Sequence, residues 1–258
     1  MMMADSMNGI IERLRRQARK IAARQPIPDF YQDFSAEVAE SGEYFQSDST
    51  VHRMKTFLAE AIENDFGHGM AHARKVALDA GALVAIEGRA ADFSADAVAR
   101  QIRMAHCAGL LHDIRRKEKE HARQGAIYAR NVLADYPFSE KEVSAICIAI
   151  ANHEAFGERM EKPTAVCRIL SDCLYDSDKF RFGPDNFIHT VWDMVAAANI
   201  SPERFMALYP RGLDFLRKIR HTFRSPTGRR YGPQFIEIGL AIGEELYTYM
   251  KTEMGLST

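Results

Sequence analysis

Apolar residues recur at intervals of three and four positions along most of the chain. Residues 8–24 place Ile10, Leu14 and Ile21 on one stripe, and arginines occupy much of the remaining surface. A stripe of this kind predicts an amphipathic helix. Pro26 follows and ends it, because proline removes a backbone donor and clashes with the preceding turn.

Residues that cap helices mark several later starts. Ser94 precedes one apolar segment of helical period, and Ser139 with Glu142 forms a capping box before another. Strand-like alternation bounded by hairpin turns is not evident, and no internal repeat is found, so the predicted fold class is all-α. Two stretches, 183–186 and 225–233, contain the Gly and Pro residues typical of loops. The predicted helices cover residues 8–24, 49–64, 95–113, 140–153, 163–180, 202–223 and 233–254.

The composition is that of a globular protein with balanced charge. Of the 258 residues, 47% are hydrophobic and 27% are charged, and the formal net charge is −1. These values argue against bulk disorder and against nucleic acid as a partner. No apolar run is long enough to span a bilayer, and Asp5 and Glu12 come too early for a signal peptide. The 4 cysteines lie in apolar stretches without CxxC spacing, so we expect reduced, buried thiols in a cytoplasmic protein.

Histidines and aspartates gather in the middle of the chain, within apolar segments of helical period. Neutral imidazole and carboxylate are ligands that divalent metal ions prefer. Burying several such groups on different helices is costly unless they share a partner, and a cation supplies one. The group consists of His68, His72, His106, His112, Asp113, His121, His153, Asp172, Asp176 and Asp178.

The adjacent pair His112 and Asp113 is the most informative part of this group. It follows the apolar run 107–111 and precedes basic residues, which places it near the end of a buried helix. Adjacent helical residues diverge by about 100°, so both side chains reach one cation only from a helix end or bend. The negative pole of the helix also favours a cation there.

In chain order, the segments around these residues form the pattern H…HD…H…H…D. The segments are AHARKVA, GLLHDI, HARQGA, AIANHE and YDSDKF. In this pattern the chain resembles the HD-domain superfamily of metal-dependent phosphohydrolases over residues 65–182. The resemblance implies an HD-domain-like helical bundle over that range. We expect helical extensions at 1–64 and 183–258, the second packed on the core.

The resemblance also implies a ligand set for one or two divalent cations. The sequence does not distinguish between Mn, Mg, Fe, Co, Ni and Zn. It places the first ion on His72, His112, Asp113 and Asp176. Members with two metals have further histidine ligands, and His121 and His153 match those positions. The family often has arginine three residues after the first histidine, where this chain has Lys75.

Some neighbouring residues compete with this ligand set. His68 shares a helix face with His72 and is either the ligand itself or, at a loop-to-helix junction, a group that contacts substrate. Asp172 is interpreted as a hydrogen-bonding support of Asp176, whereas Asp178 lies about 200° around the helix from Asp176. His106 is interpreted as a packed or supporting histidine, and the surface histidines are His52, His189 and His221.

The predicted reaction is hydrolysis of a phosphomonoester or phosphodiester, of a nucleotide or another small phosphorylated metabolite. The cation lowers the pKa of bound water and polarises a phosphoryl oxygen, with Asp113 beside His112 as bridging ligand and proton acceptor. Phosphate also needs fixed positive charge. Lys179 lies three residues after Asp176 and is the predicted catalytic and phosphate-binding cation. Further candidate phosphate-binding residues are Arg115, Arg116, Arg229 and Arg230.

Two other functions use the same ligand types. Some HD-like helical proteins hold a di-iron pair and oxidise C–H or C–P bonds with dioxygen, which predicts bound iron and oxygen dependence. An HD site can also be a catalytically silent ligand-binding or signalling module, which predicts nucleotide binding without turnover. The oligomeric state is open, because the helix at 8–24 packs either on the body, as we assume, or on another subunit.

Overall fold

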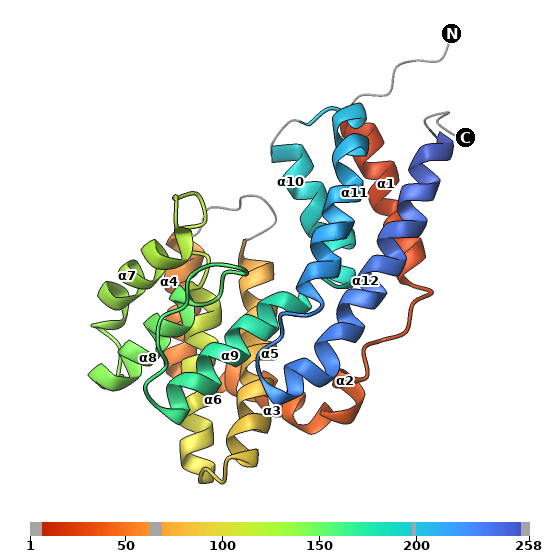
Figure 1. Cartoon of the computed structure of the whole chain (residues 1–258). Helices are drawn as coiled ribbons and strands as arrows, with labels where there is room; N and C mark the ends of the chain where they lie inside the picture. The colour runs from red at the N-terminus through yellow and green to blue at the C-terminus, as the bar shows by residue number, and fades with distance from the viewer. Residues whose placement is uncertain (1–6, 62–68, 198–199, 254–258) are drawn as a thin grey trace.

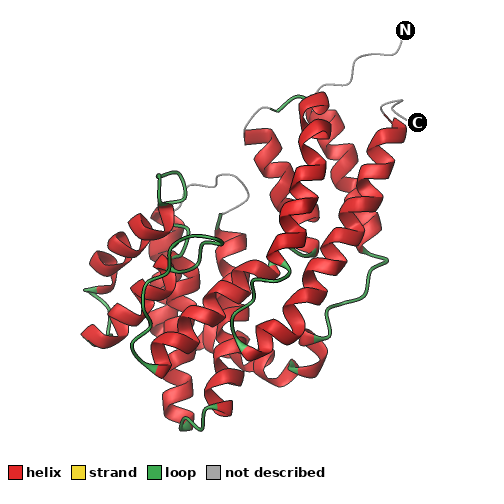
Figure 2. Cartoon of the chain, viewed as in Figure 1, coloured by secondary structure: helices red, strands yellow, loops and turns green. Residues whose placement is uncertain are grey.

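The computed structural model describes residues 7–61, 69–197 and 200–253. These residues form helices and connecting loops, as Figure 2 shows, with no strand among them. The predicted all-α fold class is confirmed. The helices are α1 (Met7–Ala22), α2 (Phe30–Asp33), α3 (Ser35–Ser47), α4 (Ser49–Ala61), α5 (Met70–Ala90), α6 (Ala95–Leu111), α7 (His121–Leu133), α8 (Glu140–Ala151), α9 (Ala165–Phe180), the π-helix η1 (Asn186–Thr190), α10 (Val191–Ala197), α11 (Pro202–Ile219) and α12 (Pro226–Glu253).

The helices lie in two adjoining groups (Figure 1). Helices α3 to α9 form a bundle in which α5 packs against α3, α6 and α9. Helices α10 to α12 lie beside this bundle, and α1 packs with them, against α12, α10 and η1. The stretch 1–64 is therefore divided, since α1 joins the C-terminal helices while α3 and α4 pack on the bundle. A continuous hydrophobic cluster, with members such as Leu83 in α5 and Ile242 in α12, runs through both groups.

The local start signals act as predicted. The Ser94 hydroxyl accepts a hydrogen bond from the backbone N–H of Ala97 at 3.3 Å, which satisfies one donor of the first turn of α6. At α8, the Glu142 carboxylate accepts from the backbone N–H of Ser139 at 2.7 Å and completes the capping box. Helix α6 ends at Leu111, so the expected position of the His–Asp pair at a helix end is confirmed.

A glycine allows helices α5 and α6 to approach closely. A Cβ atom placed on Gly109 would lie 2.5 Å from the Cα atom of Ala77, a separation that real side chains do not adopt. The backbones of the two helices therefore touch at this point. His72 lies little more than one turn before Ala77, and His112 lies one turn after Gly109. The contact thus brings the two histidines to the same place.

The segment 225–233 was predicted to be a loop and is helical instead. Helix α12 begins at Pro226, and proline is well suited to a first helical turn because its missing N–H has no partner there. The predicted helix start at Pro233 is thus seven residues too late, and Pro233 lies inside the helix. The loop predicted at 183–186 is also wrong over most of its length, because only Gly183 lies in a turn, Pro184 and Asp185 are helical, and Asn186 begins η1.

Two further predictions concern the cysteines and the membrane. Cys107, Cys147, Cys167 and Cys173 are free thiols and all are buried, as expected. Burial raises the pKa of Cys147 to about 11, which keeps this thiol protonated. Within the described ranges, none of the helices combines the length and the hydropathy that a bilayer span needs.

Candidate metal centre

Five of the predicted ligands converge on one buried place in the bundle. They form two groups that share Asp113, and the ligand atoms within each group lie within 4.8 Å of one another. The five residues come from four places in the chain, which are α5, the end of α6, the start of α7 and the turn after α8. The first group is His72, His112 and Asp113, and the second is Asp113, His121 and His153.

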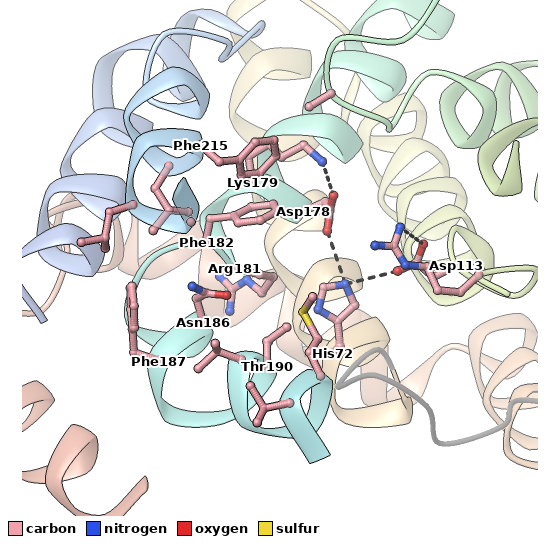
Figure 3. Close-up of a pocket in the computed structure, with 18 of the residues that line it drawn as sticks. His72, Asp113, Asp178, Lys179, Arg181, Phe182, Asn186, Phe187, Thr190 and Phe215 are labelled. Carbon is pink, nitrogen blue, oxygen red and sulfur yellow. Dashed lines mark hydrogen bonds and ion pairs between the residues drawn. The ribbon is translucent and has the colours of Figure 1, made fainter. Parts of the chain in front are cut away.

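The first group is closed by a second aspartate. The Nε2 atoms of His72 and His112 are 3.2 Å apart, and Asp113 Oδ2 lies 3.4 Å from the latter. Asp178 Oδ1 lies 3.3 Å from His72 Nε2 and 3.8 Å from His112 Nε2. Figure 3 shows His72 between the carboxylates of Asp113 and Asp178. Asp178 thus contacts the same two imidazoles as Asp113, although it is not in the group whose ligand atoms all lie within 4.8 Å of one another.

The second group uses the other oxygen of the shared carboxylate. Asp113 Oδ1 lies 3.3 Å from His153 Nε2 and 3.6 Å from His121 Nε2. Since its Oδ2 atom faces the first group, Asp113 is positioned to bridge two sites. His121 Nε2 also accepts a hydrogen bond from Arg116 at 2.7 Å, so an ion in this group competes with that guanidinium.

Backbone carbonyls set the tautomers of two of the histidines. His112 Nδ1 lies 2.7 Å from the carbonyl oxygen of Gly109, and His153 Nδ1 lies 2.7 Å from that of Ile150. A carbonyl oxygen only accepts, so each Nδ1 carries the hydrogen and donates. In the neutral rings, the Nε2 lone pairs therefore point into the cluster, as in metal-binding histidines whose other nitrogen is held by the protein.

The ionisation states of the cluster suit a divalent cation. Burial lowers the pKa of His72, and it lowers the pKa of His121 to about 4, so both imidazoles are neutral at pH 7. Burial opposes the charge of Asp113, but the adjacent His112 holds the pKa of this carboxyl well below its usual range. Burial likewise opposes the charge of Asp178, and Lys179 lowers the pKa of that carboxyl. Neutral nitrogens beside anionic oxygens form the donor set that Zn²⁺, Mn²⁺ and Fe²⁺ bind, so the residues fit a metal ion.

The pKa of His112 shifts in the opposite direction from that of His72. Burial alone would lower the pKa of its imidazole, but the Asp113 carboxylate raises it above the ordinary value. A proton and a metal ion compete for the same Nε2 atom, so metal binding at this histidine releases a proton.

The prediction that Asp176 closes the ligand set is corrected by the structure. Its carboxylate accepts hydrogen bonds from the backbone N–H groups of Arg224 and Ser225, each at 2.8 Å, and from the Ser225 hydroxyl at 2.7 Å. It is therefore directed at the segment before α12, away from His72. Because residues two apart on a helix diverge by about 200°, only one of Asp176 and Asp178 can face the cluster. Asp172 does not support Asp176 by a hydrogen bond of its own but pairs with Lys162 at 2.6 Å.

Two of the predicted cations lie at the cluster. Lys179 is 4% exposed, and its Nζ atom lies 2.5 Å from Asp178 Oδ2 (Figure 3). Arg116 lies beside Asp113, with Nη1 3.8 Å from Oδ1. Arg115 does not share this position, because its guanidinium lies over the ring of Tyr128 at 3.9 Å.

Arg229 and Arg230, two of the candidate phosphate-binding residues, lie on a helix and not on the predicted loop. Arg229 and Arg230 are exposed on the early turns of α12, where Arg229 contacts the carbonyl of Arg224 and Arg230 lies 4.9 Å from the centre of the Tyr231 ring. Neither residue lines the cavity at the metal cluster. The helical start at Pro226 is the reason, since it holds these side chains on the outer face. His68 falls outside the described residues.

The remaining histidines lie away from the cluster. His106 is fully buried, and its Nε2 atom lies 2.9 Å from the Ser41 hydroxyl, which confirms it as a packed residue. Burial lowers the pKa of His106 to about 3. His52, His189 and His221 are exposed, as predicted.

The cluster lies at one end of a cavity of about 510 Å³. Arg181 also lines this cavity and is buried. The sequence analysis missed it, because the segment 179–182, in which basic and aromatic residues alternate, resembles an ordinary helix end. Its guanidinium contacts Asp79, donates to Asp185 at 2.6 Å and donates to the Tyr31 hydroxyl at 3.0 Å. Lys75 pairs with the same Asp185 at 2.5 Å. The charge of Arg181 is thus balanced by the carboxylates of Asp79 and Asp185.

The geometry therefore joins His72, His112, Asp113, His121, His153 and Asp178 in one candidate metal centre. Lys179 and Arg116 supply positive charge beside it. The sequence analysis considered Asp178 and chose Asp176 in its place, whereas the structure places Asp178 beside the two imidazoles. Comparison of the chain with protein-family models, with curated proteins and with solved structures found no match.

Proposed function

We propose that this protein is a metal-dependent phosphohydrolase that cleaves a phosphomonoester or phosphodiester of a small metabolite. The observation that carries the proposal is Asp113, whose two oxygens face two separate histidine-containing groups at the end of a cavity. The ligands follow the H…HD…H…H…D order of the HD-domain superfamily, with Asp178 as the closing carboxylate. Cations beside the cluster match the charge of a phosphate.

The residues of the centre form two ion sites that share Asp113. His72, His112, Asp113 and Asp178 would hold a first divalent ion, and Asp113, His121 and His153 a second. A bound ion supplies an acidified water and polarises a phosphoryl oxygen. The carbonyls of Gly109 and Ile150 keep His112 and His153 oriented, so the lone pairs stay directed at the cluster without reorganisation.

Lys179 and Arg116 orient the phosphate and offset its charge. The Lys179 ammonium is buried between the rings of Tyr175 and Phe182, at 4.9 and 5.5 Å from their centres, so its position is fixed. In this position it donates to Asp178 and is within the same cavity as the cluster. Arg116 is less enclosed, since more than a third of its side chain is exposed. Fixed charge of this kind stabilises the extra negative charge of the transition state.

The test is turnover of a panel of phosphate esters by the full chain supplied in turn with Mn²⁺, Mg²⁺, Co²⁺, Ni²⁺, Zn²⁺ or Fe²⁺. Asp113→Asn is expected to lower kcat at least about 1,000-fold while the circular dichroism spectrum stays helical. The matched control is Asp172→Asn, which changes a buried aspartate that pairs with Lys162 outside the cluster. An active Asp113→Asn protein would contradict the proposal. Bound iron with oxygen consumption and without phosphate release would favour the di-iron oxygenase instead.

A further inference from the structure

The cavity at the metal centre continues far beyond the polar cluster. Most of its remaining wall comes from η1, α10 and α11, and Phe182 and Ile200 also line it. Figure 3 shows Phe187 and Phe215 across the cavity from His72 and Asp113. The cavity thus has one polar end and one long apolar part. The apolar part is lined chiefly by Phe187, Val191, Val195, Phe205, Leu213 and Leu216.

The wall that η1, α10 and α11 contribute carries no charged side chain among the described lining residues. Tyr209 presents its ring to this wall, because its hydroxyl donates to the carbonyl of Gly243 at 3.0 Å. Asn186 and Thr190 are its other polar residues. A nucleobase buried here would leave several polar atoms without partners, which costs free energy for each of them. A hydrocarbon chain has no such atoms and gains from leaving water.

The exposed rim of the cavity carries Arg116 and Glu154 near the cluster, but it is apolar on the side of α10 and α11. Met194, Leu208 and Phe215 line the cavity and are exposed at 44%, 39% and 40%. Phe156, exposed at 64%, contacts Phe215 with ring centres 6.1 Å apart. Large exposed apolar side chains gathered around a cavity mark a binding site for apolar matter.

We infer that the substrate is a monomeric amphiphile, namely a phosphate ester of a long alkyl chain. The phosphate lies at the metal centre beside Lys179 and Arg116, and the chain lies along the wall of η1, α10 and α11. The identity of the head group rests on the proposed function, whereas the chain is inferred from the cavity alone. The two anionic aspartates of the cluster repel a phosphate until cations are bound, so binding of the head group requires the metal.

A homologous series of ligands tests the inference. The full chain, loaded with Mn²⁺, is titrated by calorimetry with ethyl-, butyl-, hexyl- and octylphosphonate, whose P–C bond ester hydrolysis does not break. Each added methylene is expected to lower Kd about threefold to fourfold until the wall is covered. A Kd that stays constant from ethyl to octyl would overturn the inference.

A pair of matched variants locates the chain. Leu208→Asn changes the opening of the cavity on α11, and Ile127→Asn changes an exposed apolar residue on α7 that does not line it. Leu208→Asn is expected to weaken octylphosphonate about fivefold to tenfold and to leave ethylphosphonate unchanged. Ile127→Asn is expected to change neither. Equal weakening of the two ligands by Leu208→Asn, or equal effects of the two variants, would place the chain elsewhere and overturn the inference.

The design separates this inference from the proposed function. Binding that strengthens with chain length, without hydrolysis of any phosphate ester of the panel, supports the alkyl-chain site and refutes the phosphohydrolase. Hydrolysis of phosphate esters at a rate that ignores chain length, with phosphonates binding equally well, supports the phosphohydrolase and overturns the inference.

Discussion

The imidazoles of His72 and His112 face each other with their Nε2 atoms 3.2 Å apart, although 40 residues separate them in the chain. Two nitrogen lone pairs repel at this distance unless a proton or a cation lies between them. The carbonyl of Gly109 holds His112 in the orientation that produces this contact. Asp113 and Asp178 lie on either side of the pair, so the charge balance favours a cation.

Aspartate-to-asparagine substitutions identify which of Asp176 and Asp178 is the fourth ligand of the first group. Asp178→Asn is expected to weaken Mn²⁺ binding at least about 100-fold, because it removes an anionic ligand from the first group. Asp176→Asn is expected to leave Mn²⁺ affinity unchanged and to lower the free energy of unfolding by about 1–3 kcal/mol, because its new amide faces the donors of Ser225 and Arg224. Calorimetry and urea denaturation measure the two effects. Loss of Mn²⁺ affinity in Asp176→Asn with unchanged affinity in Asp178→Asn would identify Asp176 as the ligand.

Metal removal is expected to destabilise the folded chain. Free Mn²⁺ at one hundred times its Kd stabilises a protein that binds it only when folded by about 2.7 kcal/mol. For a chain of this size that corresponds to a rise in Tm of about 5–10 °C over the sample with EDTA. Differential scanning calorimetry measures the shift. Asp113→Asn is expected to abolish it and Asp172→Asn to retain it, and a shift that survives in Asp113→Asn would place the ion elsewhere.

The contact between α5 and α6 is expected to control both stability and metal binding. Gly109→Ala places a Cβ atom 2.5 Å from Ala77 Cα, so the helices must separate. Overpacking of this kind costs about 1–3 kcal/mol, and the separation moves His72 from His112. Gly42→Ala in α3 is the control, because its Cβ meets nothing within 4 Å, and the change is expected to be neutral or stabilising by up to about 1 kcal/mol. Equal denaturation midpoints for the two variants would contradict the role of Gly109.

A buried histidine outside the metal centre predicts how stability varies with pH. Burial lowers the pKa of His106 to about 3, whereas in the unfolded chain it returns to about 6.5. Between these values the unfolded state binds a proton that the folded state does not. The stability contributed by His106 is therefore complete above pH 6.5 and is lost as the pH falls toward 3, by about 1.4 kcal/mol per pH unit.

His106→Gln is expected to remove this share of the pH dependence, because glutamine does not titrate and can still reach the Ser41 hydroxyl. The measurement is the free energy of unfolding in urea between pH 4 and pH 7, with wild type and variant compared at each pH. His52→Gln, at an exposed position, serves as the control and is expected to keep the wild-type slope. Parallel curves for wild type and His106→Gln would show that His106 is protonated in the folded state.

Local features of the sequence were sufficient for much of this structure. The capping box of Ser139 and Glu142 acts within one helical turn, so it can be found without knowing any neighbour. The segment around His112 and Asp113 predicts its helix end for the same reason. The segment after Ser225 shows the limit of such signals, because Gly and Pro are common in loops, yet Pro226 opens a helix. Gly228 within that helix leaves the space that Asp176 occupies.

The amino-acid sequence alone determined the all-α class and the set of histidines that meet at Asp113. The spacing of apolar residues and the types of the ligand residues can both be identified without knowing how the helices pack. Only the tertiary structure decided between Asp176 and Asp178, since both lie on α9 and the packing of α5 and α12 against it determines which carboxylate faces the cluster. The same holds for Arg115 and Arg116, adjacent residues with opposite orientations. The apolar cavity also exists only after folding. The elements η1, α10 and α11 come after the metal ligands in the chain, and the cavity forms where the folded chain brings the two together.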